Sequence, residues 1–432
     1  MRMEDKVTDR IKRKNIGKGV NFTVIRDEKF KQNLISVYFI MPLARETASA
    51  NAMLPLLLKH GSREYPDMTA LNRRLNELYG ARLDGSTHKR GDYQIMALFC
   101  ECLGDNYAFG GEKVLESCAN LLKSVIFDPA FENGTFREKD VAIEKRNLID
   151  QIDSVLNDKR QYALVKLKET MCKDEAYGIF ELGRREDVEK LTPDKLYNAW
   201  KTMLSSAAVE IFLVGPGNAD YVEKSFADAF SNIDRTNIVS ASSDGIKKPE
   251  KVNTVVERLP VTQAKLVMGL RGSVAAPDNT DALHLATVIL GGSPHSKLFA
   301  NVREKMSLCY YCLSYLDKQK GIVFIDSGIE ESNYEKARGE ILRQLDELKA
   351  GNFSDDEMKN AKLYLQNALM QVEDSLDSLM GYYLAQFISG DTRAPKEMAD
   401  AIMKVTRDEV IKAANGVSLD TVYLLAGLKE GE

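Results

Sequence analysis

Long apolar runs are missing from this sequence, which contains no stretch of about 18 or more apolar residues, the length that spans a bilayer. The amino terminus, MRMEDKVTDRIKRK, has neither an apolar core nor a cleavage site of small residues, so we predict no secretory signal. Charge of one sign is also lacking, because 59 basic and 64 acidic residues leave a formal net charge of -5. This balance disfavours a general nucleic-acid or anionic-membrane binder, and a cytoplasmic location is the simplest expectation.

Cysteine is scarce, with six residues scattered along a chain of 432. So few thiols argue against a disulfide framework and fit reduced side chains. Cys309 and Cys312 form a CxxC pair in SLCYYCLSY, whose aromatic and apolar flanks predict a strand. Residues three apart on a strand point to opposite faces, and no second CxxC completes a zinc site, so we interpret both as ordinary packed thiols.

Histidine is scarcer still. The four histidines are His60, His88, His284 and His295, and none stands at metal-ligand spacing from another. The stretch STHKRGDY around His88 predicts a polar hairpin tip. The sequence also lacks a Gly-x-Ser-x-Gly elbow and a cysteine in a catalytic setting, so we expect no independent peptidase chemistry of another class.

What the sequence does contain is an internal repeat. Residues 24–62 and 256–293 share one order of elements: a short strand, a polar turn, a second strand, a small-residue bend and an apolar helix ending in Gly-Ser. Residues 191–216 and 405–428 share another, in which a Thr caps an amphipathic helix that is followed by a buried strand. These matches indicate two copies of one α+β unit.

The repeat sets the expected fold class and domain limits. Residues 135–158 and 354–391 have the spacing of amphipathic helices, and runs such as DYQIMALFCE alternate as strands do. We predict an α+β protein of two homologous α/β-sandwich halves, each a mostly antiparallel sheet covered by helices. The halves would span residues 1–230 and 254–432, joined by the polar linker 231–253.

The segment GGSPHSKLFANVREKMSLCY resembles a motif of the pitrilysin or insulinase family of zinc peptidases, GG-x-x-S-R-L-F-x-x-V-R-E-K-x-G-L-x-Y. The matching residues are Gly291, Gly292, Ser296, Leu298, Phe299, Val302, Arg303, Glu304, Lys305, Leu308 and Tyr310. Lys297 replaces the more usual Arg, and Ser307 stands where the family usually has Gly. The resemblance covers essentially residues 20–430, is weaker in the first half, and implies the duplicated LuxS/metallohydrolase-like fold.

The resemblance also implies a former role for the helix in SANAMLPLLLKHGS. Active relatives carry H-x-x-E-H on this helix, where two His bind zinc and the Glu is the general base on the zinc-bound water. Aligned on the Gly-Ser end of the helix, these three positions fall on Ala52, Pro55 and Leu56. The third ligand of active relatives, a Glu, falls on Lys145, whose ammonium has no lone pair. We therefore expect no metal and no cofactor on this chain.

Two residues near these positions could be considered as replacements. An alignment shifted by one would restore a carboxylate at Glu144, but one carboxylate without the His pair makes no zinc site. His60 is the only imidazole nearby, and a lone His at a helix end more often favours the helix dipole. Pro55 removes an amide donor and is expected to displace the first turns of the helix from catalytic geometry.

In the second half, the resemblance assigns Arg303 and Tyr310 to substrate and oxyanion binding at a zinc site on another half or subunit. A guanidinium donates to carbonyl oxygens, and a phenol donates to a tetrahedral oxyanion. The alternative is that Arg303 forms a surface salt bridge near Glu304 and that Tyr310 is packed in a sheet. The adjacent Tyr311 leaves the register open by one residue.

Small bacterial members of this family can divide the zinc motif and the Arg and Tyr between two subunits. The resemblance therefore implies a non-catalytic subunit of a heterodimeric endopeptidase, inactive alone, with zinc on a homologous partner. The peptide substrate would be held as an extended strand at a sheet edge. A homodimer stays open, and so does a structural or peptide-binding pseudoenzyme without a proteolytic role.

Overall fold

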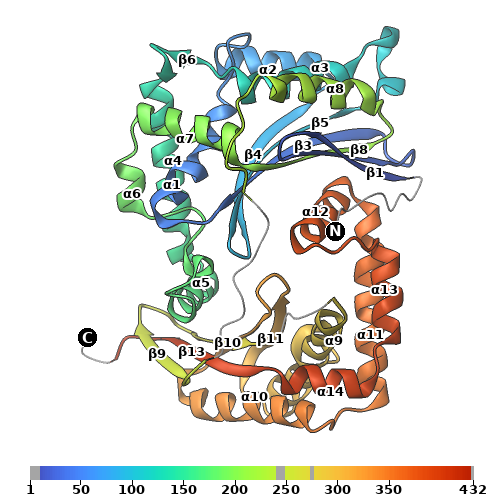
Figure 1. Ribbon diagram of the computed structural model, residues 1–432. Helices are drawn as coiled ribbons and strands as arrows, with labels where there is room; N and C mark the ends of the chain where they lie inside the picture. The colour runs from blue at the N-terminus through green and yellow to red at the C-terminus, as the bar shows by residue number, and fades with distance from the viewer. Residues whose placement is uncertain (1–9, 240–248, 273–276, 430–432) are drawn as a thin grey trace. The chain divides into compact units, whose positions relative to one another are not determined.

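The computed structural model describes residues 10–239, 249–272 and 277–429 (Figure 1). The described residues form two compact units. The described parts of Met1–Asp153, Ile179–Ser242 and Asp374–Ile388 make up the first unit. Those of Ser154–Gly178, Ser243–Glu373 and Ser389–Glu432 make up the second unit.

The first unit is built on a six-stranded sheet with the order β1-β2-β8-β3-β5-β4. Its strands are β1 (Ile11–Gly17), β2 (Val20–Arg26), β3 (Gln32–Pro42), β4 (Arg82–Arg90), β5 (Tyr93–Leu103) and β8 (Ala208–Gly215). Only β2 and β8 pair in parallel; the other neighbours are antiparallel. β3 is buried from Asn33 to Ile40 because it lies between two strands and under helices on its faces.

Helices cover both faces of this sheet. They are α1 (Arg45–Leu58), α2 (Met68–Glu77), α3 (Val114–Phe127), α4 (Glu138–Asn157), α6 (Arg185–Glu189), α7 (Pro193–Ser206), α8 (Ala219–Ser231) and α12 (Leu376–Ser389), with a small sheet of β6 (Phe131–Glu132) and β7 (Thr135–Phe136) beside them. α1, α3 and α7 enclose the main core with the sheet. α12 covers a different part of the sheet, where Phe387 stacks on Phe212 at 5.9 Å between ring centres.

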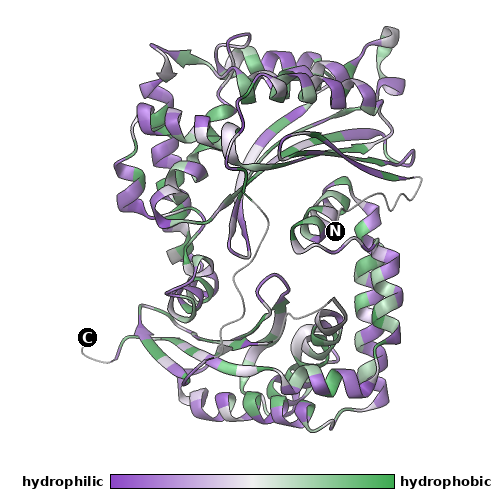
Figure 2. Ribbon diagram, viewed as in Figure 1, coloured by the Kyte–Doolittle hydropathy of each residue, from purple (hydrophilic) through white to green (hydrophobic). Residues whose placement is uncertain are grey.

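The second unit is built on a five-stranded sheet with the order β11-β12-β10-β13-β9. Its elements are α5 (Lys159–Met171), β9 (Asn253–Arg258), β10 (Ala264–Arg271), α9 (Pro277–Thr287), β11 (Cys309–Asp317), β12 (Ile322–Ile329), α10 (Tyr334–Lys349), α11 (Asp355–Gln371), α13 (Pro395–Lys404), α14 (Arg407–Asn415) and β13 (Ser418–Ala426). Two π-helical segments, η4 (Val288–Gly292) and η5 (Leu298–Lys305), lie between α9 and β11. Figure 2 shows hydrophilic and hydrophobic residues interspersed along α10, as an amphipathic helix requires.

The two sheets repeat one topology. In the first, β2 pairs in parallel with β8, and β3, β5 and β4 follow as antiparallel neighbours. In the second, β9 pairs in parallel with β13, and β10, β12 and β11 follow in the same way. The predicted fold class, two homologous halves with mostly antiparallel sheets and covering helices, is confirmed.

Each unit includes a helix from the other half of the sequence. α5, which follows α4 in the first half, packs on β10 and β13 of the second unit. Most of α12, from the second half, belongs to the first unit. Sequence periodicity gave no sign of this exchange, because an amphipathic pattern marks the buried face of a helix and not the sheet it meets.

Of the predicted linker 231–253, residues 240–248 lie outside the described residues, as does the amino-terminal stretch 1–9. α8 ends at Ser231 and β9 begins at Asn253, so the expected limits of the linker coincide with the ends of these elements. The division of the chain into consecutive halves, 1–230 and 254–432, stays a prediction.

Candidate functional site

α1 is apolar on nearly every side, and the structure buries it accordingly. Ala, Met and Leu favour the helix, and the positions aligned with the zinc motif, Ala52, Pro55 and Leu56, are all buried. Ala52 and Leu56 belong to the main hydrophobic cluster of the first unit. The three side chains together offer no donor atom to a metal ion.

The predicted displacement of the first turns by Pro55 is not seen as a break, because α1 runs through this residue from Arg45 to Leu58. Two other contacts hold the helix in place. Gln94 of β5 donates to Ala48 O at 2.8 Å, and its Oε1 accepts from Asn51 Nδ2 at 3.1 Å. These bonds satisfy buried amides and tie α1 to the centre of the sheet.

Lys145 does not point into a ligand position. Its ammonium donates to the main-chain oxygen of Glu189 at 2.9 Å and lies at the surface. The neighbouring Glu144 is buried on α4, with 5% of its surface exposed. The residue that turns inward at this point of α4 is therefore the carboxylate, one position before the aligned ligand.

Glu144 contacts His60, and this pair was not predicted. His60 Nε2 lies 2.6 Å from Glu144 Oε1, and His60 Nδ1 lies 3.4 Å from Asp140 Oδ1. All three side chains are buried. Asp140 and Glu144 stand at i and i+4 on α4, a spacing that places both on one face, so the sequence held a signal for the cluster that we did not use.

The hydrogen bonds from His60 and Asn147 outweigh the effect of burial on Glu144 and hold the pKa of its carboxyl below the ordinary value of 4.5. The carboxylate is therefore the stable form of Glu144 at neutral pH. The cluster supplies one imidazole and two carboxylates, but among the residues that the structure describes no group of three or more His, Cys, Asp or Glu is arranged to hold a metal ion.

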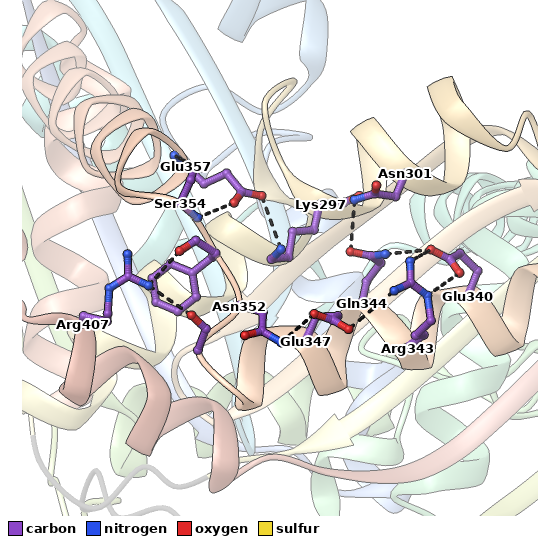
Figure 3. A network of polar contacts seen from close by, with 12 residues as sticks. Lys297, Asn301, Glu340, Arg343, Gln344, Glu347, Asn352, Ser354, Glu357 and Arg407 are labelled. Carbon is purple, nitrogen blue, oxygen red and sulfur yellow. Dashed lines mark hydrogen bonds and ion pairs between the residues drawn. The ribbon is translucent and has the colours of Figure 1, made fainter.

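The family-like segment of the second unit is fixed by a network of polar contacts (Figure 3). Lys297, just before η5, is buried and its Nζ lies 3.5 Å from Glu357 of α11. Asn301 within η5 donates to Gln344 of α10 at 3.1 Å, and Gln344 donates to Glu340 at 2.7 Å. η5 is thus held on two helices, and its orientation determines where Arg303 points.

The first of the paired glycines, Gly291, lies where a side chain would not fit. A Cβ at this position would lie 2.6 Å from Ser314 N and 2.7 Å from Leu298 Cδ1, too close for any side chain. The backbone of η4 therefore packs directly against β11. This close approach brings the end of η5 to the first residues of β11.

Arg303 lies near the end of η5 with its guanidinium partly exposed. Its Nε is 3.5 Å from Glu304 Oε1, and its guanidinium carbon lies 4.6 Å from the centre of the Phe299 ring. The side chain of Arg303 is 39% exposed, and that of Glu304 is 58% exposed. The surface ion pair that we considered as the alternative is present, but it is long and exposed and so contributes little.

Tyr310 is a bulge residue at the start of β11. Cys309 pairs with Ile329 and Tyr311 with Gly328, so Tyr310 has no partner on β12. Its side chain is 76% exposed, which makes the alternative of a residue packed in the sheet wrong. Tyr311, in contrast, donates to Asp326 at 3.1 Å and lies under the guanidinium of Arg160.

The bulge also corrects the expected orientation of the CxxC pair. Cys309 and Cys312 do not point to opposite faces, because the extra residue Tyr310 places both on one side of β11. The neighbouring Cys312 thiol, together with Ser327 and the nearby charge of Arg303, lowers the pKa of the Cys309 thiol. Both cysteines are free, as predicted.

The remaining histidines take no part in these sites. The stretch around His88 forms a hairpin between β4 and β5 as predicted, with its turn at Gly91 and Asp92. His88 itself lies within β4, and burial lowers the pKa of its imidazole to about 4. His284 lies half-buried in α9, where desolvation lowers the pKa of its imidazole, and His295 is exposed. Within the described ranges, no helix is both long enough and apolar enough to cross a membrane.

Comparison with known proteins supports a family assignment. The family described as Peptidase M16 inactive domain matches residues 190–365. The chain is 31% identical over 415 residues to the probable inactive metalloprotease YmfF of Bacillus subtilis, covering 95% of this chain and 96% of that protein. It is 24% identical over 317 residues to the uncharacterized zinc protease YmxG of the same organism, covering 73% of each.

The fold is similar to that of a solved structure over its full length. The crystal structure of a conserved protein from Enterococcus faecalis matches with a TM-score of 0.90 and 27% sequence identity, covering 98% of this chain and 100% of that one. The duplicated architecture and the family-like motif of the second unit therefore agree with each other.

Proposed function

The chain belongs to the M16 family of metallopeptidases, the pitrilysin and insulinase family, and from this we propose that it is the non-catalytic subunit of a heterodimeric peptidase. Zinc would reside on a homologous partner subunit. This chain would bind extended peptide and would contribute Arg303 and Tyr310 to the zinc site of that partner. It would have no peptidase activity alone.

The observation that carries the proposal is the difference between Tyr310 and Tyr311. Tyr311 is held by Asp326 and Arg160, whereas Tyr310 is presented to solvent by a bulge. A bulge that re-aims one side chain out of a sheet is a common device next to active sites. An exposed phenol and a partly exposed guanidinium seven residues before it supply two donors for a carbonyl oxygen that becomes an oxyanion.

The first unit supports the division of labour. Its family-equivalent positions hold Ala52, Leu56 and Lys145 in place of the zinc ligands and Pro55 in place of the general base, and none of these can bind zinc. A chain that kept one half of a site and lost the other is explained most simply if a second chain supplies the lost half. Bacillus subtilis has relatives of both kinds, one named as inactive and one as a zinc protease.

The peptide would be added to a sheet edge. β4 and β11 are edge strands of their sheets and present main-chain donors and acceptors on one side. Tyr310 lies at the start of β11, so a peptide paired there would pass beside the exposed phenol. Recognition through the main chain needs few particular side chains of the substrate.

The test is cleavage of a peptide library by this protein, by its nearest zinc-motif relative from the same genome, and by the two together, with zinc measured on each chain. We expect activity only in the mixture. Tyr310→Phe should lower kcat about 100-fold, as removal of one oxyanion donor does, and should leave zinc on the partner unchanged. Arg303→Lys should chiefly raise KM because the bidentate donor is lost.

Tyr364→Phe is a matched control, since this residue is an exposed tyrosine on α11 outside the segment. Full activity of the mixture with Tyr310→Phe would refute the assigned role. If the two chains neither associate nor cleave, the second candidate, a peptide-binding or structural pseudoenzyme, takes its place.

A further inference from the structure

We propose that the first unit carries a second, separate site, which binds a small molecule bearing a chain of phosphate groups at the amino-terminal end of α8. The site lies at a pocket of about 510 Å³. Its walls are the start of β1, the end of β2, the start of β3, the loop between β8 and α8, and the segment after β5. It shares no residue with the proposed peptide site.

The end of α8 supplies the first donors. α8 has 13 residues, and the first N–H groups of a helix have no acceptor within the helix. Asn218 caps the helix and accepts from Asp220 N at 3.0 Å, which satisfies one of these groups. Asn218, Ala219 and Asp220 line the pocket, so the positive end of the helix dipole faces it.

Asn33 is the independent observation that indicates a ligand. Its side chain lines the pocket and is completely buried. Its Oδ1 accepts from Gly217 N at 2.8 Å, which fixes the orientation of the amide. Its Nδ2 has no hydrogen-bond partner among the described residues. A buried amide donor without an acceptor is costly, and an anion in the pocket would supply the acceptor.

The loop before α8 is shaped for this arrangement. A Cβ on Gly217 would lie 2.4 Å from Leu115 Cδ2 and 2.7 Å from Asn33 Oδ1. Glycine is therefore required for the loop to reach Asn33. The contact places the amide of Asn33 next to the first residues of α8, so both sets of donors converge on one place.

Two lysines provide the positive charge. Lys12 and Lys113 line the pocket and are exposed, and neither has a hydrogen bond or an ion pair with any other described residue. The pocket also contains Arg10 and Arg26, which are already paired with Asp27 and Glu28. The lysines are thus the cations whose charge is left for a ligand.

The chemistry favours phosphate over other ligands. The lining also includes the carboxylates of Glu28, Asp105 and Asp220, of which Glu28 is paired with Arg26 and Asp105 accepts from Leu115 N at 3.0 Å. The two lysine ammonium groups, the helix terminus and the amide N–H of Asn33 are donors, which suits an anion. A pocket of about 510 Å³ has room for more than one phosphate group. Tyr107, 49% exposed, forms part of the wall and offers an aromatic face. Inorganic polyphosphate and a nucleoside triphosphate share this chemistry.

The test is isothermal titration of the full chain with tripolyphosphate, and separately with ATP, at low and at raised KCl. We expect one equivalent to bind, with an affinity that falls as salt rises. The double variant Lys12→Gln/Lys113→Gln should weaken binding of both probes about tenfold or more. Lys139→Gln/Lys224→Gln is the matched control, because both lysines are exposed on the same unit and neither lines the pocket.

Asn33→Asp keeps the acceptor for Gly217 and replaces the free N–H groups by a negative charge, so it should abolish binding. Binding of ATP tighter than that of tripolyphosphate would identify a nucleotide, and equal binding would identify the phosphate chain as the ligand. The proposal is overturned if neither probe binds, if citrate binds as well as tripolyphosphate, or if the lysine double variant binds like its control. Peptidase activity enters none of these measurements, so the outcome is independent of the proposed subunit role.

Discussion

At the residue scale, His60 and Glu144 join the end of α1 to α4 through a contact of 2.6 Å between Nε2 and Oε1. In active members of the family a zinc ion joins the corresponding helices, because its ligands come from both. Here Ala52 and Leu56 fill the space of the two histidines, and the buried imidazole and carboxylate provide the connection. We predict that the pair stabilises the packing of the end of α1 against α4.

We expect Glu144→Gln and His60→Ala each to lower the free energy of unfolding by about 2–3 kcal/mol, since each removes a buried hydrogen bond to a charged group. Urea denaturation measures the change. His295→Ala is the control, because this histidine is exposed and its loss should be neutral. An unchanged midpoint for Glu144→Gln would show that the contact contributes nothing to stability.

The same pair sets a pH dependence. The pKa of Glu144 is lower in the folded chain than its ordinary value of 4.5, so the folded state takes up this proton less readily than the unfolded state. Its contribution is fully present above pH 4.5 and is lost as pH falls through the lowered pKa. The stability difference between the native chain and Glu144→Gln should therefore shrink below pH 4.5.

At the element scale, the chain adopts an unusual backbone conformation between Arg303 and Tyr310, where η5 ends. Ser307 has φ of 51°, in the left-handed region, and its N–H donates to Arg303 O at 3.1 Å to close the end of η5. The family motif usually has Gly at this position. Glycine adopts this conformation without the strain that a Cβ causes, which gives the physical reason for the motif.

Ser307→Gly should therefore stabilise the chain, although Gly loses more conformational entropy on folding. The left-handed region costs a residue with a Cβ roughly 1–2 kcal/mol, which the substitution removes. The larger entropy loss of Gly on folding offsets about half of this gain, so we expect a net stabilisation of about 0.5–1 kcal/mol. Thermal unfolding measures it. A loss of stability would mean that the serine hydroxyl makes a contact that outweighs the strain.

The elements themselves could largely be predicted from the sequence, and the site could be predicted in part. Periodicity identified the repeated strands and helices, because burial of one face imposes a period of 2 or 3.6 residues. The bulge at Tyr310 could not be predicted, since one extra residue leaves the apolar alternation of the strand nearly unchanged. For that reason the prediction that Cys309 and Cys312 point to opposite faces was wrong, and the sequence left open which of Tyr310 and Tyr311 faces the site.

The contact between His60 and Glu144 was missed for a different reason. It joins residues 84 apart in the chain, and no local pattern reports a pairing of that kind. Only the i, i+4 spacing of Asp140 and Glu144 hinted that two acids share one face of α4. This pairing depends on how α1 and α4 pack into the same hydrophobic core.

At the scale of the whole molecule, the exchange of helices makes each unit depend on both halves of the sequence. α5 buries Leu167 and Met171 against Val267 and Phe324 of the second unit. In the first unit, Phe387 of α12 stacks on Phe212, and Arg13 lies 4.6 Å above the Phe387 ring. A chain cut between the two sequence repeats would leave both of these surfaces uncovered.

We therefore expect residues 1–242 and 243–432 to be unable to fold as separate fragments. Each buried apolar side chain that loses its cover costs about 1.5–3 kcal/mol, and a few such losses equal the whole stability of a typical domain. Expressed alone, both fragments should aggregate or bind hydrophobic dyes; expressed together, they should form a one-to-one complex. A 1–242 fragment that is monomeric and unfolds cooperatively would contradict this, since it would show that α12 is dispensable for the first unit.

Transfer of residues 374–388 onto the end of the first fragment provides the complementary experiment. If the fragment fails to fold because Phe212 is uncovered, adding this segment through a flexible linker should restore its folding. A scrambled segment of the same composition should not.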